Sequence, residues 1–103
     1  MIKNYFLQSS KVINSLHKHE KKIKSIIKEV INCNDKKGKI LVAGNGGSCS
    51  DAEHFVGELL CTYKDPSRRP ISAISLASHP AAVTAWSNDF GWETYFERQT
   101  KAH

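Results

Sequence analysis

The stretch that decides the fold is Lys39-Ile-Leu-Val-Ala43, followed at once by Gly44-Asn-Gly-Gly-Ser48 and a helical pattern over residues 51–60. A short continuous apolar run between glycines is typical of a strand buried on both faces, as in a parallel sheet. The apolar residues after the loop recur at helical spacing: Ala52, Phe55, Val56, Leu59 and Leu60. Strand, glycine loop and helix in direct succession predict an α/β fold.

The residues before this stretch predict a helical arm in two parts. Apolar residues recur at helical spacing through residues 2–33, and the polar stretch His17 to Lys22 marks a break between two helices. Residues 34–38, Asn-Asp-Lys-Lys-Gly, combine turn formers with a glycine and end the second helix. We therefore predict an N-terminal helical arm at 1–38 and the start of an α/β domain at residue 39.

The residues after it supply one more strand and further helices. Residues 71–76 read as a second short strand, and Pro80 suits the first turn of the helix that follows. Helical spacing returns over residues 81–86 and again over residues 92–103. This alternation of helices and strands predicts a parallel sheet.

Length and composition exclude several classes of protein. With 103 residues, 40% of them hydrophobic and 24% charged, the chain has room for one small globular domain and does not resemble a disordered one. No apolar run approaches the roughly 20 residues of a membrane span, and the first residues lack the pattern of a signal peptide. Three cysteines without a CxxC spacing favour reduced thiols. We expect a cytoplasmic protein with no membrane partner.

The positive charge belongs to the N-terminal segment. Through Lys39, ten lysines stand against three acidic residues, a net charge of +7, whereas the remainder has five basic and seven acidic residues, a net charge of −2. A basic helix can bind nucleic acid, or it can present a solvated face. Because no aromatic residues interleave the lysines of residues 18–28, we favour the solvated face and expect no nucleic-acid partner.

The glycine-rich loop Gly44–Ser48 is the first candidate site. Between a strand and a helix, such a loop directs backbone N–H groups toward an anion at the helix N-terminus. It lacks the third glycine of the GxGxxG fingerprint and the Gly-Lys-Ser/Thr of a Walker A loop. Two interpretations stay open: a phosphate or sugar-phosphate site, and a tight turn in which Ser48 and Asp51 form a capping box.

His54 and Glu58 form the second candidate site. Four residues apart, they project from one side of the helix, with Asp51 one turn earlier and the apolar residues on roughly the opposite side. We therefore expect the apolar side, Phe55 included, to face the core and the pair to face outward. Such an outward pair can be an ordinary solvent-exposed contact. Beside a bound sugar phosphate, however, the carboxylate could move a proton, and the pair could supply two of the ligands of a zinc ion.

The third candidate is Asn88-Asp-Phe-Gly91, which follows the short helix after the second strand. This is where α/β folds place ligand contacts, but Asn, Asp and Gly are also the usual residues of a plain turn, so both interpretations stay open. His79, before Pro80, is assigned to the start of a helix rather than to a ligand. Aromatic side chains near the C-terminal end are assigned to the core or a subunit contact: Trp86, Trp92, Tyr95 and Phe96.

Four segments stand in a specific order along the chain: Gly44-Asn-Gly-Gly-Ser48, Asp51-Ala-Glu-His-Phe-Val-Gly-Glu-Leu59, Asn88-Asp-Phe-Gly91 and Phe96-Glu-Arg-Gln99. Together with the two-part N-terminal helix, this order resembles the phosphoheptose isomerases, enzymes of the sugar-isomerase (SIS) superfamily. The resemblance covers nearly the whole chain. It implies a flavodoxin-like parallel-sheet sandwich of SIS type, of which residues 39–103 form a part behind the arm at 1–38.

The resemblance also implies a reaction and a site. The reaction converts sedoheptulose 7-phosphate to D-glycero-D-manno-heptose 7-phosphate through an enediol, in heptose biosynthesis for lipopolysaccharide or capsule. By resemblance, His54 and Glu58 ligate zinc, and Glu58 also transfers the proton. The resemblance places substrate contacts at these positions: Asn45, Gly46, Gly47, Ser48, Glu58, Asn88 and Asp89.

Two further expectations follow from the resemblance. The first is a homotetramer with its active sites at subunit contacts. The second concerns length, because members of the family are about twice as long as this chain and complete the site with a Ser/Thr-rich phosphate loop and a late Gln and His. We therefore expect an incomplete chain with little activity by itself. The alternative is a non-catalytic SIS module that binds a sugar phosphate or regulates a partner; the presence of Glu58 favours the enzyme.

Overall fold

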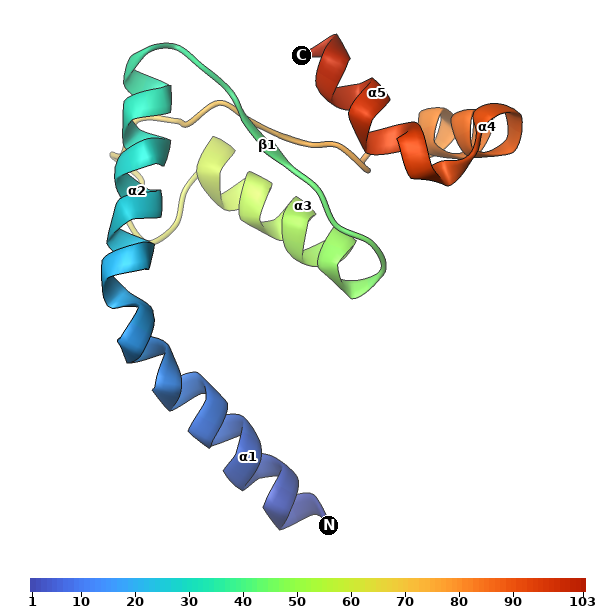
Figure 1. The fold of residues 1–103 in the computed structure, drawn as a ribbon. Helices are drawn as coiled ribbons and strands as arrows, with labels where there is room; N and C mark the ends of the chain where they lie inside the picture. The colour runs from blue at the N-terminus through green and yellow to red at the C-terminus, as the bar shows by residue number, and fades with distance from the viewer. The chain divides into compact units, whose positions relative to one another are not determined.

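The N-terminal residues form two consecutive helices with a short turn between them. The structure, a computed structural model that describes all 103 residues, divides into two units, Met1–Asn32 and Cys33–His103. Figure 1 shows the bend between the two helices at the turn, which confirms the break predicted at residues 17–22. The elements of this segment are α1 (Ile2–Ser15), the 3₁₀ turn η1 (Leu16–His19) and α2 (Glu20–Asp35).

The apolar stripe of this helical arm is exposed. No residue of α1 or α2 is buried. The exposed apolar side chains lie at the helical spacing that predicted the arm: Ile2, Tyr5, Phe6, Leu7, Val12, Ile13, Leu16, Ile23, Ile26, Ile27 and Ile31. Helices draw most of their stability from packing such a stripe, so the arm is a candidate for contact with another molecule. No helix is long and apolar enough to cross a bilayer.

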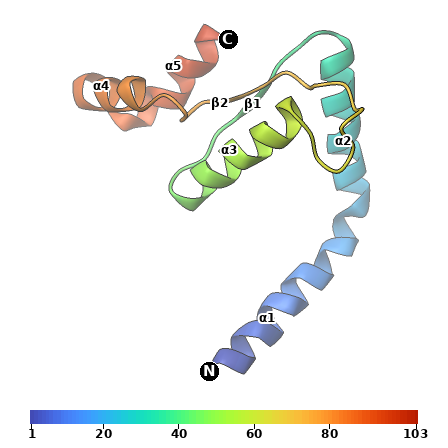
Figure 2. The same cartoon turned by 180° about the vertical axis from the view of Figure 1, so that it is seen from behind.

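The second unit is built on two short parallel strands, β1 (Ile40–Val42) and β2 (Ala73–Ser75). Ile40 lies opposite Ala73, and Val42 lies opposite Ser75. The crossover between the strands contains helix α3 (Gly47–Leu60), which packs on both of them (Figure 2). This arrangement confirms the predicted α/β fold with parallel strands, although both strands are shorter than the segments that predicted them.

The core of the second unit lies between α3 and the strands. Ala52 and Val56 of α3 and Ala73 of β2 are buried, each with at most 7% of its surface exposed. The prediction that the first strand is buried on both faces is wrong, because all three residues of β1 are only half-buried. Strand β1 pairs with β2 alone and α3 packs on it, so its remaining sides keep contact with solvent.

Helix α4 (Pro80–Phe90) begins as predicted and ends later. His79 is its N-cap residue and Pro80 occupies its first turn. The helix continues through Phe90, four residues past the predicted end at Trp86, so Asn88 and Asp89 are helical rather than part of a loop. Gly91, with φ of 94°, then ends the helix in a backbone region that favours glycine.

The 3₁₀ turn η2 (Trp92–Thr94) and helix α5 (Tyr95–Ala102) complete the chain. Tyr95 is fully buried, and its hydroxyl donates a hydrogen bond of 2.8 Å to the Leu76 carbonyl just after β2. Burial raises the pKa of the Tyr95 phenol. Tyr95 therefore connects α5 to the end of the sheet.

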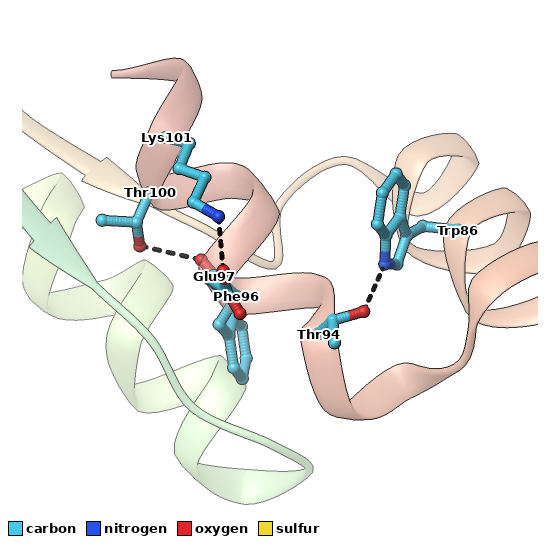
Figure 3. Close-up of polar contacts among 6 residues, drawn as sticks. All are labelled: Trp86, Thr94, Phe96, Glu97, Thr100 and Lys101. Atoms are coloured by element: carbon cyan, nitrogen blue, oxygen red, sulfur yellow. Dashed lines mark hydrogen bonds and ion pairs between the residues drawn. The ribbon is translucent and has the colours of Figure 1, made fainter.

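Aromatic and polar contacts connect α4 with η2 and α5. The Trp86 indole N–H donates to the Thr94 hydroxyl at 3.0 Å (Figure 3). The Arg98 guanidinium lies 5.1 Å from the centre of the Trp86 ring. Lys101 pairs with Glu97 one turn earlier, and this contact lowers the pKa of the Glu97 carboxyl. Of the four aromatic residues assigned to the core or a subunit contact, Tyr95 is buried, Trp86 and Phe96 are half-buried, and Trp92 is 37% exposed.

Candidate functional site

The glycine loop leads from β1 directly into α3. Gly46 is the N-cap, with φ of 56°, and the amide of Cys49 donates to its carbonyl at 3.0 Å. A Cβ atom at Gly44 would lie 2.3 Å from the Ser48 carbonyl oxygen, so only glycine fits there. The predicted capping box is wrong, because α3 starts at Gly47, which places Ser48 inside the first turn, and no side chain caps the helix.

The loop leaves its main chain open to a ligand. A Cβ atom at Gly46 or Gly47 would meet nothing within 4 Å, so a group can approach the backbone closely at both positions. The amides of Ser48, Cys49 and Ser50 donate to the carbonyls of Asn45 and Gly46, and the positive end of the helix dipole lies at this loop. The N-terminus of α3 therefore has the shape and polarity that an anionic or hydroxylated ligand requires.

His54 and Glu58 meet on the outer face of α3. His54 Nε2 lies 3.0 Å from Glu58 Oε1. The His54 side chain is 78% exposed, whereas the Glu58 side chain is 32% exposed. The second carboxylate oxygen, Oε2 of Glu58, is buried and accepts no hydrogen bond. Since a buried acceptor without a partner costs free energy, Glu58 has an unused acceptor position for a ligand.

The pair lies in a pocket of about 580 Å³ between α3 and the segment that follows it. The polar or charged residues that line the pocket are Asp51, His54, Glu58 and Arg68. Its apolar and aromatic lining residues are Phe55, Leu59, Tyr63 and Ile71. The prediction that the whole apolar stripe of this helix faces the core is therefore wrong. Phe55 is 49% exposed, because two short strands cover only the part of α3 around Ala52 and Val56.

The His54–Glu58 pair fits two ligands of a zinc ion. Zinc binds His nitrogen and carboxylate oxygen at about 2.0–2.2 Å in tetrahedral geometry, which puts two such ligand atoms about 3.3–3.5 Å apart. The observed separation of 3.0 Å is close to that, and Oε2 adds an unused donor atom. No group of three or more His, Cys, Asp or Glu side chains gathers in the chain, so it brings two candidate ligands together and no more.

Asn88 and Asp89 lie in the last turn of α4, and both are exposed. The Asn88 side-chain amide donates to Asp89 Oδ1 at 2.9 Å. No hydrogen bond joins them to the glycine loop or to the His54–Glu58 pair. Their contact with substrate stays a prediction from the resemblance.

Arg68 is a pocket residue that the sequence patterns did not single out. Its guanidinium donates to the carbonyls of Glu58 and Leu59 at 2.6 and 3.2 Å, at the C-terminal end of α3. One signal was present in the sequence: no glycine follows Leu60, so the last carbonyls of this helix need a donor from elsewhere.

Comparison with known proteins gives these residues a context. No family model matches the sequence. The phosphoheptose isomerase of Helicobacter pylori strain P12 is 41% identical over 103 residues, covering 99% of this chain and 53% of that enzyme. The structure of a phosphoheptose isomerase from Francisella tularensis matches with a TM-score of 0.89 at 32% identity, over 98% of this chain and 53% of the other. This chain is homologous to the N-terminal half of the phosphoheptose isomerases.

The homology confirms the resemblance to phosphoheptose isomerases and the α/β fold with its long N-terminal helix. A third relative, phosphoheptose isomerase 1 of Campylobacter jejuni serotype O:2, is 33% identical over 102 residues and again aligns over 99% of this chain. The chain spans about half the length of the curated phosphoheptose isomerases that it matches. Arm, glycine loop and α3 all lie within the aligned region.

Proposed function

We propose that this chain forms part of a phosphoheptose isomerase. This enzyme converts sedoheptulose 7-phosphate to D-glycero-D-manno-heptose 7-phosphate in the cytoplasm. The observation that carries the proposal is the Glu58 carboxylate. It lies in a pocket, is held by His54 at 3.0 Å, and keeps one buried oxygen unpaired. These features occur in a chain that is 41% identical to a phosphoheptose isomerase.

Glu58 is the group that moves the proton. A ketose–aldose isomerisation removes a proton from carbon 1 of the ketose and returns one to carbon 2 of the enediol. A single carboxylate can do both, because the two carbons are adjacent. His54 contacts Oε1 of Glu58, and the apolar side chains of Phe55 and Leu59 line the same pocket.

His54 and Glu58 are also the zinc ligands that this chain contributes. A zinc ion held by these residues would supply a Lewis acid that polarises substrate oxygens. The remaining ligands come from outside residues 1–103 in this proposal, since the chain brings only two candidates together. We therefore expect little turnover by the chain alone.

The glycine loop binds the substrate at the other end of the site. Asn45, Gly46, Gly47 and Ser48 surround the N-terminus of α3, where a backbone N–H can donate to an anion or a hydroxyl oxygen. Ser48 and Glu58 are ten residues apart, which is about 15 Å along the helix axis. One substrate reaches both ends only if it lies along the outer face of α3, past Asp51 and His54.

We further propose that the protein is a homo-oligomer, with the tetramer of the resemblance as the expected state. The exposed apolar stripe of the arm supports this proposal, because a monomer would leave it in water. The sugar phosphate is the proposed small-molecule partner. Asn88 and Asp89 complete the proposed substrate contacts.

A chimera tests this function. Residues 1–103 are fused to the part of the H. pylori strain P12 phosphoheptose isomerase that lies beyond the aligned region, and turnover of sedoheptulose 7-phosphate is measured. We expect turnover by the chimera and none by its Glu58→Gln variant, with the same circular dichroism. The matched control is Glu53→Gln, which changes an exposed carboxylate of α3 that does not line the pocket.

Two outcomes would contradict the proposal. Normal turnover by the Glu58→Gln chimera would remove Glu58 from the proton transfer. Binding of the sugar phosphate by a folded chimera without any turnover would instead support the non-catalytic SIS module.

A further inference from the structure

The C-terminal end of α3 is held by a side chain from the following loop. Arg68 Nη2 donates to the Glu58 carbonyl at 2.6 Å, and Arg68 Nη1 donates to the Leu59 carbonyl at 3.2 Å and to the Arg69 carbonyl at 2.8 Å. The Ile71 amide also donates to the Leu59 carbonyl, at 3.0 Å. One guanidinium thus joins the last turn of the helix to the chain just before β2.

The helix needs this contact because its own sequence does not cap it. The last four carbonyls of a helix have no partner within the helix. Here the helix ends at Leu60, followed by Cys61 with φ of −105°, so the left-handed glycine cap that commonly satisfies these carbonyls is absent. A cation at this end also interacts favourably with the helix dipole.

The restrained turn is the one that carries Glu58. The carbonyl of Glu58 accepts from Arg68, while its carboxylate contacts His54 one turn earlier. Movement of the last turn of α3 would therefore displace the Glu58 carboxylate relative to His54. Arg68 and Glu58 line the same pocket, so the restraint acts directly on the wall of the site.

We propose that Arg68 is a positioning residue for Glu58: by binding the last carbonyls of α3 it keeps the carboxylate in place for proton transfer. This inference rests on the proposed function of Glu58. Arg68 touches the backbone of the base and acts through it.

The first experiment measures steady-state kinetics of the chimera with Arg68→Ala, Arg68→Lys and Arg69→Ala. A displacement of about 1 Å in a reacting group costs up to about 100-fold in rate, so we expect Arg68→Ala to lower kcat about 10- to 100-fold. KM should change less than about twofold, because binding at the glycine loop is untouched. Lysine, a point charge without the fork of the guanidinium, should restore part of kcat.

Two controls separate positioning from general effects. Arg69→Ala removes a neighbouring positive charge whose guanidinium contacts Asp35 at 2.6 Å and lies outside the pocket; we expect normal kcat. Tyr95→Phe removes a buried hydrogen bond away from α3, and we expect a lower melting temperature with normal kcat below it. Equal loss of kcat in Tyr95→Phe and Arg68→Ala at matched stability would overturn the proposal.

The second experiment does not depend on turnover. This experiment uses the 103-residue chain without the fused segment of the chimera. Compared with the parent chain, amide hydrogen exchange should become faster at Cys61 and Ile71 in Arg68→Ala and stay unchanged in Arg69→Ala. Unchanged exchange in Arg68→Ala would overturn the proposed restraint. If exchange and kcat both respond but Glu58→Gln remains active, the role of Glu58 fails while the restraint by Arg68 stands.

Discussion

The helical arm and α3 have the same helical spacing of apolar residues, but they differ in how much of that apolar face is buried. In α3, Ala52 and Val56 are buried against the strands, whereas no residue of α1 or α2 is buried. Helical spacing of apolar residues thus predicts a helix and the face it will bury, but not the molecule that covers this face. The chain covers the inner face of α3 by itself; the proposed homo-oligomer would cover the stripe of the arm with other copies.

The largest effect should come from a charge at the covered face. Val56→Asp places a carboxylate without a partner in the core between α3 and the sheet, and such changes cost about 3 kcal/mol or more. We expect the 103-residue chain carrying this substitution to lose its cooperative unfolding transition. The transition is measured by the fluorescence of Trp86 and Trp92, which lie in the second unit. A transition within about 0.5 kcal/mol of the parent would contradict the assigned core.

An aspartate introduced into the apolar stripe of the arm should change the assembly of the protein rather than the stability of its fold. Ile27→Asp adds a charge to the exposed stripe, so we expect analytical ultracentrifugation to give a smaller molar mass for the assembly than in the parent. The free energy of unfolding, measured in dilute protein, should stay within about 0.5 kcal/mol of the parent. Lys22→Ser, on an exposed position outside the stripe, is the control and should leave the mass unchanged. An unchanged mass in Ile27→Asp would show that the stripe does not join copies.

A smaller effect is expected at Tyr95. Tyr95→Phe removes the hydrogen bond to the Leu76 carbonyl, which should cost about 1 kcal/mol at pH 7 in urea unfolding. Burial raises the pKa of Tyr95 in the folded state above its ordinary value of 10.0. The neutral phenol therefore contributes fully to the free energy of unfolding below pH 10, and this contribution is lost as the pH rises further. Tyr95→Phe should therefore lose less stability than the parent between pH 9 and pH 11. Equal losses in both proteins would contradict this account.

Local patterns predicted the elements of the fold well. The break in the arm, the strand before the glycine loop and the helix beginning at Pro80 all depend on residues close together in the chain. The predicted capping box was wrong because the glycines let α3 begin one residue before Ser48. The end of α4 was misplaced because Asn88 and Asp89 suit a turn, yet the helix continues to the glycine at 91.

The candidate site was predicted only in part. The spacing of His54 and Glu58 placed them on one side of α3, and their contact at 3.0 Å follows from it. The pocket around them depends on the loop that returns from α3 to β2, which no local pattern describes. Phe55 was therefore assigned to the core, and the contact of Arg68 with Glu58, ten residues earlier, was missed.

The most direct test of the central claim follows a deuterium label at carbon 1 of sedoheptulose 7-phosphate in the chimera. Of two deuterons at carbon 1, we expect one to leave during turnover, reaching carbon 2 or solvent; Glu58→Gln should stop this loss and Glu53→Gln should not. Loss of the label at an undiminished rate in the Glu58→Gln chimera would contradict the assignment of Glu58 as the base.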